Sequence, residues 1–325
     1  MSGHASIKPD LTHGLFTTAP PDEPVETSRL GRFKQLLAAK LSALIMPVVK
    51  KAAAPYLGGE TVEEALCVAR RLGGEGYAVT LGYWDTGQDT AEAVAEVQAD
   101  AIRQLTAQSL DGTLSLKPPA LHYAPELAAR LAAAAAEAGL RLHCDSHGVE
   151  AADPSNAMLE AMIARLGAAR LGTTLPGRWR RSLSDADWAV AQGLNVRVVK
   201  GQWPDPADPG RDMAEGFLAV IERLAGRARH VAVATHDTKL AMAAIARLQA
   251  AGTACELELL FGMPAKALLR WAAAKGVGRR VYVPFGAGFV PNAVRVLRRN
   301  PRLVLAVGKD RLAAAAAFLA SPFRS

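Results

Sequence analysis

The sequence predicts an α/β protein built as a (β/α)8 barrel with an N-terminal helical extension. From Tyr56 onward, short runs rich in Val and Leu alternate with longer Ala-rich stretches of helical periodicity, which is the pattern of repeated βα units. Eight strand candidates follow one another, and the helical candidates between them match the barrel in number and length. The expected strands span residues 79–84, 114–117, 142–146, 170–175, 196–201, 231–236, 255–261 and 280–285.

The expected elements divide the chain into three parts. Residues 1–55 predict a flexible leader and then a helix at 30–51, which would either pack on the domain or lie on a membrane surface. Residues 56–310 form the expected barrel, and residues 311–325 a helical tail. The capping-box sequence Thr61-Val62-Glu63-Glu64 predicts a helix at 61–73, ahead of the first strand. Further helices are expected near residues 90–108, 125–138, 155–166, 184–192, 212–225, 238–250, 265–275 and 288–299.

Composition excludes several classes of protein. With 50% apolar and 21% charged residues, the 325-residue chain is neither wholly disordered nor collagen-like. Three widely spaced cysteines without a CxxC pair favour reduced thiols in a cytoplasmic protein, with neither a disulfide framework nor a metal site. The longest apolar stretches, at 41–49 and 312–320, fall short of the ~20 residues that a membrane span needs, and no signal peptide is expected.

The net charge of +7 raises the question of a nucleic-acid partner. Lys and Arg are scattered along the chain, however, and aromatic residues make up only 6% of it. Even the basic clusters at 178–181 and 295–302 lack the interleaved aromatic residues that stack on bases. We therefore expect a solvated basic surface and no nucleic-acid partner.

Polar residues gather where the expected strands end, the face on which barrel enzymes bind ligands. Any one of them is more often a solvated loop residue, and His236 alone could cap the next helix; it is their recurrence on one face that predicts a site. Arg197 strengthens the prediction, because a guanidinium inside a barrel strand needs carboxylates or a bound anion. Glu256 and Glu258 are two apart, so they share one face of a strand. The expected mouth holds Lys117, Arg197, Lys200, His236 and Arg295 against Asp145, Glu256 and Glu258, with Thr235 and Tyr282 nearby. This cationic excess favours an anionic ligand, and phosphates are the obvious candidates.

Several motifs then occur in the order and spacing of a known family. They include Arg197-Val198-Val199-Lys200-Gly201, Ala234-Thr235-His236-Asp237 and Val281-Tyr282-Val283-Pro284-Phe285-Gly286. Together with segments at 59–61, 79–81 and 256–263, they resemble the proline dehydrogenase family over residues 56–305. The resemblance implies an FAD-dependent (β/α)8 barrel that oxidises L-proline to Δ1-pyrroline-5-carboxylate in proline catabolism. It also implies a quinone or other electron acceptor and leaves open a peripheral position at the inner face of the membrane.

The resemblance assigns roles to individual residues. Arg197 is similar to the arginine beside flavin N5, and Lys200, Gly201, Thr235, His236 and Glu256 are similar to residues that bind the cofactor. For the substrate, Lys117 and Asp145 correspond to the pair at the amine, Tyr282 to the tyrosine at the ring, and Arg295 to the first of two arginines that bind the carboxylate.

The chain departs from the family pattern around the expected flavin and substrate. Val296 stands where the second arginine is expected and Asn292 where a tyrosine is expected; losing one charged hydrogen bond of this type costs about 1.5–3 kcal/mol. Pro176 replaces a glutamine, Gln202-Trp203 replaces Ala-Tyr, and Glu258 replaces a glutamine. Weak proline binding and weaker flavin retention are therefore expected.

Three other functions stay open. The first is a flavin dehydrogenase of another amine or imino acid, and the second is a barrel pseudoenzyme or binding protein without turnover. The third is a Schiff-base aldolase using Lys117 or Lys200, which would leave Arg197 and the segment at 234–237 unexplained.

Overall fold

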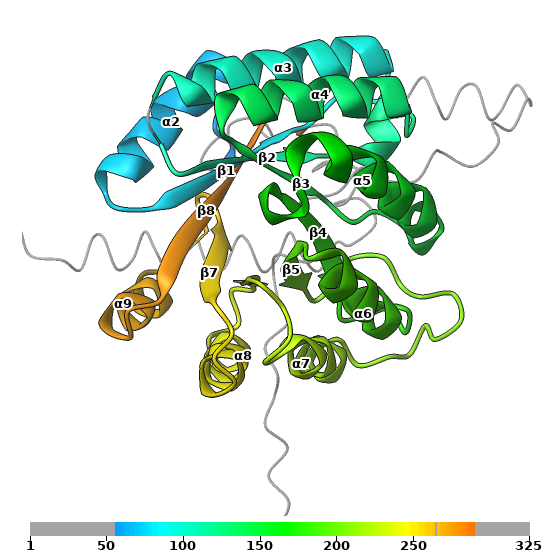
Figure 1. The fold of residues 1–325 in the computed structure, drawn as a ribbon. Coiled ribbons are helices and arrows are strands. Elements are labelled where there is room, and N and C mark those ends of the chain that lie inside the picture. The colour runs from blue at the N-terminus through cyan, green and yellow to red at the C-terminus, as the bar shows by residue number, and fades with distance from the viewer. Residues whose placement is uncertain (1–55, 109, 264, 290–325) are drawn as a thin grey trace, which may run out of the picture.

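A closed barrel of eight parallel strands forms the centre of the protein. The computed structural model describes residues 56–108, 110–263 and 265–289. The strands follow one another around the barrel in chain order (Figure 1). They are β1 (Ala78–Tyr83), β2 (Gly112–Leu116), β3 (Arg141–Cys144), β4 (Leu171–Pro176), β5 (Asn195–Val199), β6 (Val231–Ala234), β7 (Cys255–Leu260) and β8 (Gly278–Phe285). The predicted (β/α)8 barrel is confirmed.

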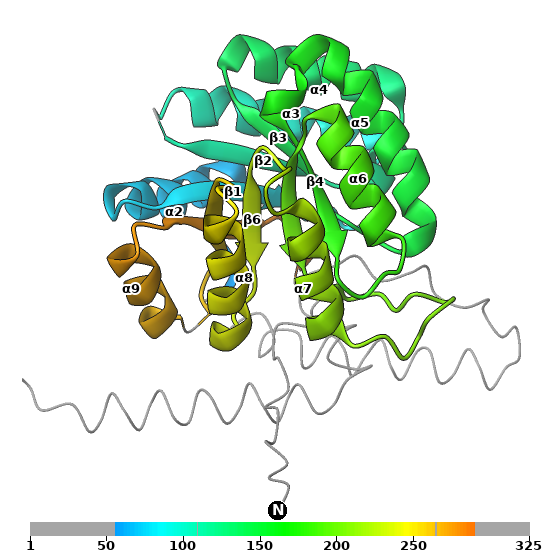
Figure 2. The same cartoon turned by 60° about the horizontal axis from the view of Figure 1, so that its bottom comes forward.

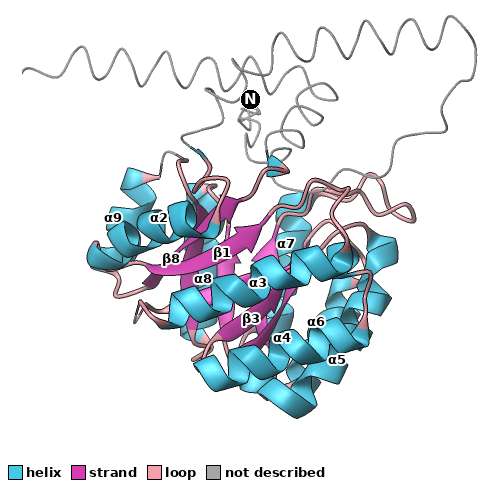
Figure 3. Cartoon of the chain, turned by 90° about the horizontal axis from the view of Figure 1, so that it is seen from above, coloured by secondary structure: helices cyan, strands magenta, loops and turns pink. Residues whose placement is uncertain are grey.

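Helices surround the barrel on its outer side (Figures 2 and 3). They are α2 (Val62–Gly74), α3 (Ala91–Thr106), α4 (Pro125–Ala138), α5 (Ala152–Leu166), α6 (Ser182–Gln192), α7 (Met213–Leu224), α8 (Thr238–Ala250) and α9 (Lys266–Ala274). The predicted capping box is confirmed, because the Thr61 hydroxyl accepts a hydrogen bond from the Glu64 amide while the Glu64 carboxylate accepts one from the Thr61 amide. Short 3-10 turns lie at Pro118–Leu121, Val149–Ala151 and Ala168–Arg170. Within the described part of the chain, no helix is long and apolar enough to cross a membrane.

Alternation along the strands separates an apolar outer layer from a polar interior. Val196 and Val198 on β5 are buried in the hydrophobic core, whereas Arg197 between them takes part in ion pairs inside the barrel. On β1, Val79 and Leu81 likewise join the core, and the Thr80 hydroxyl bonds the interior carboxylate of Glu258. The barrel interior is therefore a layer of charged and hydrogen-bonded groups enclosed by an apolar shell.

Several strands end earlier than the sequence predicts, although β4 ends one residue later and β8 ends as predicted. Strand β3 ends at Cys144 and β6 at Ala234, so Asp145, Thr235 and His236 lie in the loops that follow. These residues lie at the open end of the barrel. The expected leader and helix at 30–51, the tail at 311–325 and nearly all of the helix expected at 288–299 lie outside the described residues.

Candidate active site

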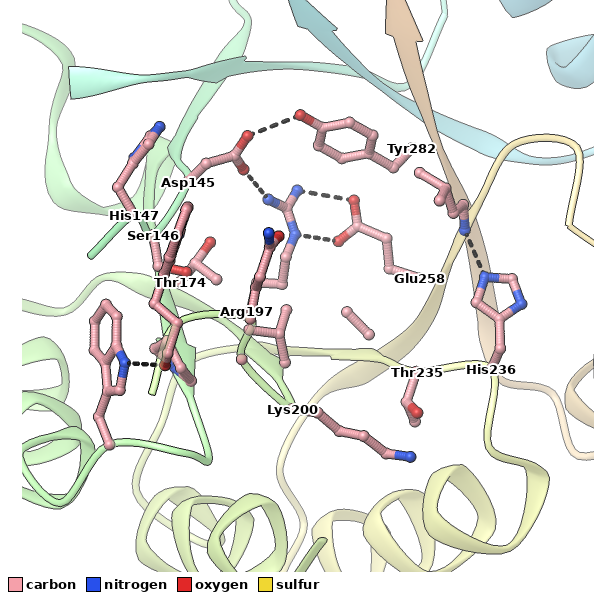
Figure 4. Close-up of a pocket in the computed structure, with 18 of the residues that line it drawn as sticks. Asp145, Ser146, His147, Thr174, Arg197, Lys200, Thr235, His236, Glu258 and Tyr282 are labelled. Carbon is pink, nitrogen blue, oxygen red and sulfur yellow. Dashed lines mark hydrogen bonds and ion pairs between the residues drawn. The ribbon is translucent and has the colours of Figure 1, made fainter. Parts of the chain in front are cut away.

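A cavity of about 200 Å³ opens at the carboxyl ends of the strands. Figure 4 shows its lining residues pointing inward from strands and loops around the barrel. Its polar lining residues are Lys117, Asp145, Ser146, His147, Thr174, Arg197, Lys200, Thr235, His236, Glu258 and Tyr282. Its apolar lining residues include Pro176, Trp179, Val199, Trp203, Ala234, Leu259 and Leu260. The cavity thus offers both charged groups and apolar surface to a bound molecule.

Arg197 lies between two carboxylates in the cavity lining (Figure 4). Its Nε lies 2.7 Å from Glu258 Oε2 and its Nη2 lies 2.8 Å from Glu258 Oε1, while its Nη1 lies 2.7 Å from Asp145 Oδ1. Burial disfavours the charged guanidinium, but the two carboxylates outweigh this effect and raise the pKa of Arg197 above its ordinary value. The buried arginine predicted from the sequence is therefore satisfied by carboxylates of the protein.

Asp145 joins most of the predicted substrate-binding residues. Its carboxylate accepts hydrogen bonds from the Ser115 hydroxyl at 2.6 Å and the Tyr282 hydroxyl at 2.7 Å, and it lies 3.7 Å from Lys117 Nζ. Burial alone would raise the pKa of Asp145, but the charges of Lys117 and Arg197 and these two hydrogen bonds lower it to about 2. Asp145 is consequently an anion across the physiological pH range.

Lys117 is held at the edge of the cavity by three neighbours. Its Nζ donates a hydrogen bond of 2.6 Å to the Tyr83 carbonyl oxygen, lies near Asp145, and stands 4.7 Å from the centre of the Trp84 ring. Only 2% of the residue is exposed, and this burial lowers the pKa of Lys117 in spite of the Asp145 charge. The amine is thus easier to deprotonate than an exposed lysine.

Tyr282 fits against β1 because residue 82 is a glycine. A Cβ atom at Gly82 would lie 2.0 Å from the Tyr282 hydroxyl oxygen, so any larger side chain would displace the ring. The Arg197 guanidinium carbon lies 5.3 Å from the ring centre. Burial and the Asp145 charge raise the pKa of Tyr282 well above its ordinary value, so the phenol stays a neutral donor.

The lower part of the view in Figure 4 holds the residues expected at a phosphate-bearing ligand. Lys200 Nζ lies 3.3 Å from Asp237, and His236 Nε2 accepts a hydrogen bond of 3.0 Å from the Leu260 amide. Asp237, rather than His236, caps helix α8 by accepting from the Leu240 amide. His236 therefore remains on the cavity wall, together with Thr235.

Two further observations fit a polar aromatic cofactor such as FAD. Buried nitrogens of two lining residues, Trp203 Nε1 and His147 Nδ1, find no hydrogen-bond partner in the described part of the protein. Gly201 adopts a φ of 94°, and a Cβ there would lie 2.6 Å from Pro176 Cβ, so only glycine allows this backbone approach. These ring nitrogens suit polar ligand atoms, and the apolar lining residues suit a flat ring.

The prediction that Glu256 stands at the mouth is wrong. Residues two apart on a strand share a face but lie about 6.6 Å apart along it, so they reach different depths of the barrel. Glu256 pairs with Arg280 at 2.7 Å and lines a second cavity of about 40 Å³, which Arg197 and Glu258 also line. The Arg197–Glu258 pair therefore forms a wall shared by the two cavities.

The structure brings most predicted site residues together. Of the residues named from the sequence, those that line the larger cavity are Lys117, Asp145, Arg197, Lys200, Gly201, Thr235, His236 and Tyr282. Arg295, Asn292 and Val296 lie outside the described residues. Sequence reasoning missed Ser115, His147 and Trp179; Ser115 could have been found because it lies two residues before Lys117, on the same face of the strand.

Fold and site together define a (β/α)8-barrel enzyme with its cavity at the carboxyl face. No protein-family model matches the chain. The chain is 24% identical over 266 residues to the proline dehydrogenase of Deinococcus radiodurans, covering 76% of this chain and 86% of that protein. It is 24% identical over 264 residues to proline dehydrogenase 1 of Bacillus subtilis subsp. natto, with the same coverage.

Solved structures agree with this fold. Proline utilization A from Bdellovibrio bacteriovorus, inactivated by N-propargylglycine, superimposes with a TM-score of 0.65 at 17% identity and covers 81% of this chain. A variant of proline utilization A from Bradyrhizobium japonicum gives a TM-score of 0.61 at 20% identity and covers 86%. The chain spans 34% of the length of each of these proteins. The resemblance to proline dehydrogenases is confirmed, and the chain is an oxidoreductase related to them.

Proposed function

We propose that the protein is an FAD-dependent dehydrogenase that oxidises L-proline or a related cyclic amino acid to the imine, which for proline is Δ1-pyrroline-5-carboxylate. The cluster of Asp145, Arg197, Tyr282 and Lys117 in the cavity lining carries this proposal. It offers an anion for a substrate amine, a lysine of lowered pKa and a fixed guanidinium within one site. The relatives named proline dehydrogenase support the same reaction.

The residues at the amine bind the substrate and move its proton. Asp145 is anionic, so it attracts a protonated amine, and the hydrogen bonds from Ser115 and Tyr282 fix its orientation. The amine must lose a proton before the carbon beside it can lose a hydride. Lys117 lies 3.7 Å from Asp145 and has a lowered pKa, so its neutral form is our candidate for accepting that proton.

A second group of residues would hold the cofactor. FAD supplies the two-electron acceptor that no side chain of the protein can replace. Lys200, Gly201, Thr235 and His236 would bind its polar chain, and Arg197 would lie against the ring. Glu256 is excluded from this group because it lies at the other end of the barrel interior.

We further propose that Arg295 binds the substrate carboxylate. With Val296 beside it, one guanidinium can tether the carboxylate but leaves the ring free to pivot, so KM for proline should be high. We also propose that a membrane quinone or another acceptor reoxidises the flavin. The protein would then be cytoplasmic and lie at or near the inner face of the membrane.

The cavity wall also supports a second candidate, a flavin dehydrogenase of a different amine or imino acid. Pro176, Trp203 and Glu258, three of the departures from the family pattern, all line the cavity. They change its shape and charge at the place where cofactor and substrate would bind. A substrate without a carboxylate would need neither of the two arginines.

Visible absorption of the purified protein, before and after incubation with FAD, tests the flavin assignment. A colourless protein that binds no added FAD would contradict it and favour a pseudoenzyme or an aldolase. Anaerobic mixing with L-proline, D-proline, pipecolate and simple cyclic amines then separates the two dehydrogenases. With proline as the substrate, Val296→Arg should lower KM; reduction only by amines lacking a carboxylate would favour the second candidate.

A further inference from the structure

Glu258 is a buried carboxylate whose main partner is Arg197. Glu258 is 3% exposed and Arg197 is 4% exposed. Two parallel contacts of 2.7 and 2.8 Å join them, which is the bidentate geometry of an ionised pair. The Thr80 hydroxyl donates a third hydrogen bond, of 2.8 Å, to Glu258 Oε1. The Glu258 carboxylate thus accepts three hydrogen bonds inside the barrel.

Arg197 does not need this second carboxylate for neutralisation. Asp145 already lies 2.7 Å from its Nη1, and one carboxylate balances one guanidinium. Burying a further carboxylate costs desolvation energy. Charge balance alone therefore does not explain why a second carboxylate, that of Glu258, lies beside Arg197. Arg197, Asp145 and Glu258 together carry a formal net charge of −1. The nearby cation Lys117 lies 3.7 Å from Asp145 Oδ2, the oxygen that Arg197 does not contact.

The charge of Glu258 faces the larger cavity. Glu258 and Arg197 both line that cavity, so a molecule bound there meets the guanidinium and its carboxylate partner together. Electrostatic effects in such a buried place are screened less than in water. A neutral side chain at position 258 would leave the wall one unit more positive.

We propose that Glu258 acts through Arg197 as a positioning residue that lowers the reduction potential of bound flavin. The inference rests on the proposed function, because it requires FAD in the larger cavity. In the reaction the substrate amine releases a proton to the protein, and the neighbouring carbon transfers a hydride, two electrons and one proton, to the flavin. The reduced flavin therefore carries one more negative charge than the oxidised form. Arg197 stabilises that charge, and Glu258 weakens the stabilisation.

The test replaces Glu258 by its neutral isostere. Glu258→Gln provides one amide oxygen as an acceptor for Arg197, and Asp145 remains in place. The midpoint potential of the FAD-loaded protein, measured by titration with reference dyes, should rise by about 30 mV or more, which is a tenfold change in the two-electron equilibrium constant. Affinity for sulfite, which forms an anionic flavin adduct without substrate, should rise at least tenfold in parallel.

Three variants control for structural effects. Glu256→Gln removes the same charge from the same strand, but this residue pairs with Arg280 in the smaller cavity, so the potential should change much less. Thr80→Val removes a hydrogen bond to Glu258 without changing formal charge. It should change the two-electron equilibrium constant of the flavin by less than threefold. Glu258→Asp keeps the charge and should retain most of the wild-type potential.

Each outcome decides one question. Flavin that is bound by both wild type and Glu258→Gln at equal potentials would overturn the inference and leave the proposed function intact. Equal shifts in Glu258→Gln and Glu256→Gln would show a general charge effect and would overturn the role assigned to Arg197. A wild-type protein that binds no FAD would overturn the proposed function and this inference with it.

Discussion

Asp145 is the residue on which the charged groups of the site depend. It contacts Arg197, Tyr282 and Ser115 directly and lies beside Lys117, so side chains from three strands and from the residue that follows β2 meet at one carboxylate. Its pKa of about 2 means that the folded protein stabilises the ionised form of the Asp145 side chain. Because a group of lowered pKa adds stability above its unfolded pKa and loses it as pH falls through the folded pKa, this contribution disappears between about pH 4 and pH 2.

Asp145→Asn should remove that pH-dependent contribution. The difference between 3.8 and about 2 corresponds to about 2 kcal/mol of unfolding free energy. Urea unfolding at a series of pH values should show the wild type losing about this much more than the variant between pH 4 and pH 2. The exposed Glu137→Gln serves as the control and should follow the wild type. Parallel curves for wild type and Asp145→Asn would mean that Asp145 is not stabilised as an anion.

Sequence reasoning succeeded for those site residues whose position depends on the strand pattern alone. Arg197, Lys117 and Tyr282 could be placed inside the barrel because strand alternation sets the direction of each side chain. The depth of Glu256 and the pairing of Glu258 with Arg197 could not be predicted, because they depend on how strands β5 and β7 are staggered across the closed barrel. Stagger is a property of the whole sheet and leaves no local signal.

Close packing between the end of β4 and helix α7 holds the loop that borders the cavity. A Cβ at Gly216 in α7 would lie 1.9 Å from the Gly177 carbonyl oxygen, just after β4. Arg211 Nε donates a hydrogen bond of 3.1 Å to the same oxygen. The loop after β5, which carries Trp203, is therefore joined to the end of β4 at this contact and through the Trp179 hydrogen bond to the Trp203 carbonyl.

Gly216→Ala should destabilise the protein although alanine favours helix formation. Overpacking against the Gly177 backbone costs about 1–3 kcal/mol, more than the helix propensity gained. Gly74→Ala is the matched control, because it lies at the end of helix α2 with nothing within 4 Å of the added Cβ. Chemical denaturation of both variants checks the prediction, and equal stability of the two would show that α7 can shift away from β4 without cost.

The ends of elements were harder to predict than their order. All eight strands and the helices in the described range occur where the alternating pattern indicates, because periodicity extends over whole segments. The ends of β3 and β6 came earlier than expected, at Cys144 and Ala234. Hydrogen bonding between neighbouring strands, and not hydrophobicity, decides where such a strand stops.

For the whole molecule, the site exists only when the barrel is closed. Tyr282 on β8 pairs in register with Thr80 on β1, and the cavity takes residues from the β2 end through to β8. Anything that binds this cavity therefore stabilises the complete fold and not one segment of it. Ligand binding and global unfolding are linked by mass action.

FAD should raise the thermal unfolding temperature of the protein. At a concentration 100 times Kd, the linkage gives about 2.7 kcal/mol, or about 5–10 °C for a domain of this size. Riboflavin, which lacks the phosphates, should give a smaller shift at the same concentration, and Lys200→Met should reduce the FAD shift but not the riboflavin shift. Equal shifts for FAD and riboflavin in the wild type would contradict the role of Lys200 in binding the cofactor's phosphates.

An anaerobic titration of the FAD-loaded protein with L-proline tests whether this cavity binds a flavin beside a cyclic amino acid. Proline should bleach the visible flavin absorption, and high proline concentrations should be needed. Asp145→Asn should abolish the bleaching while FAD stays bound. The proposed function would be contradicted if neither L-proline nor related cyclic amino acids reduced the flavin at any concentration, although dithionite reduced it normally.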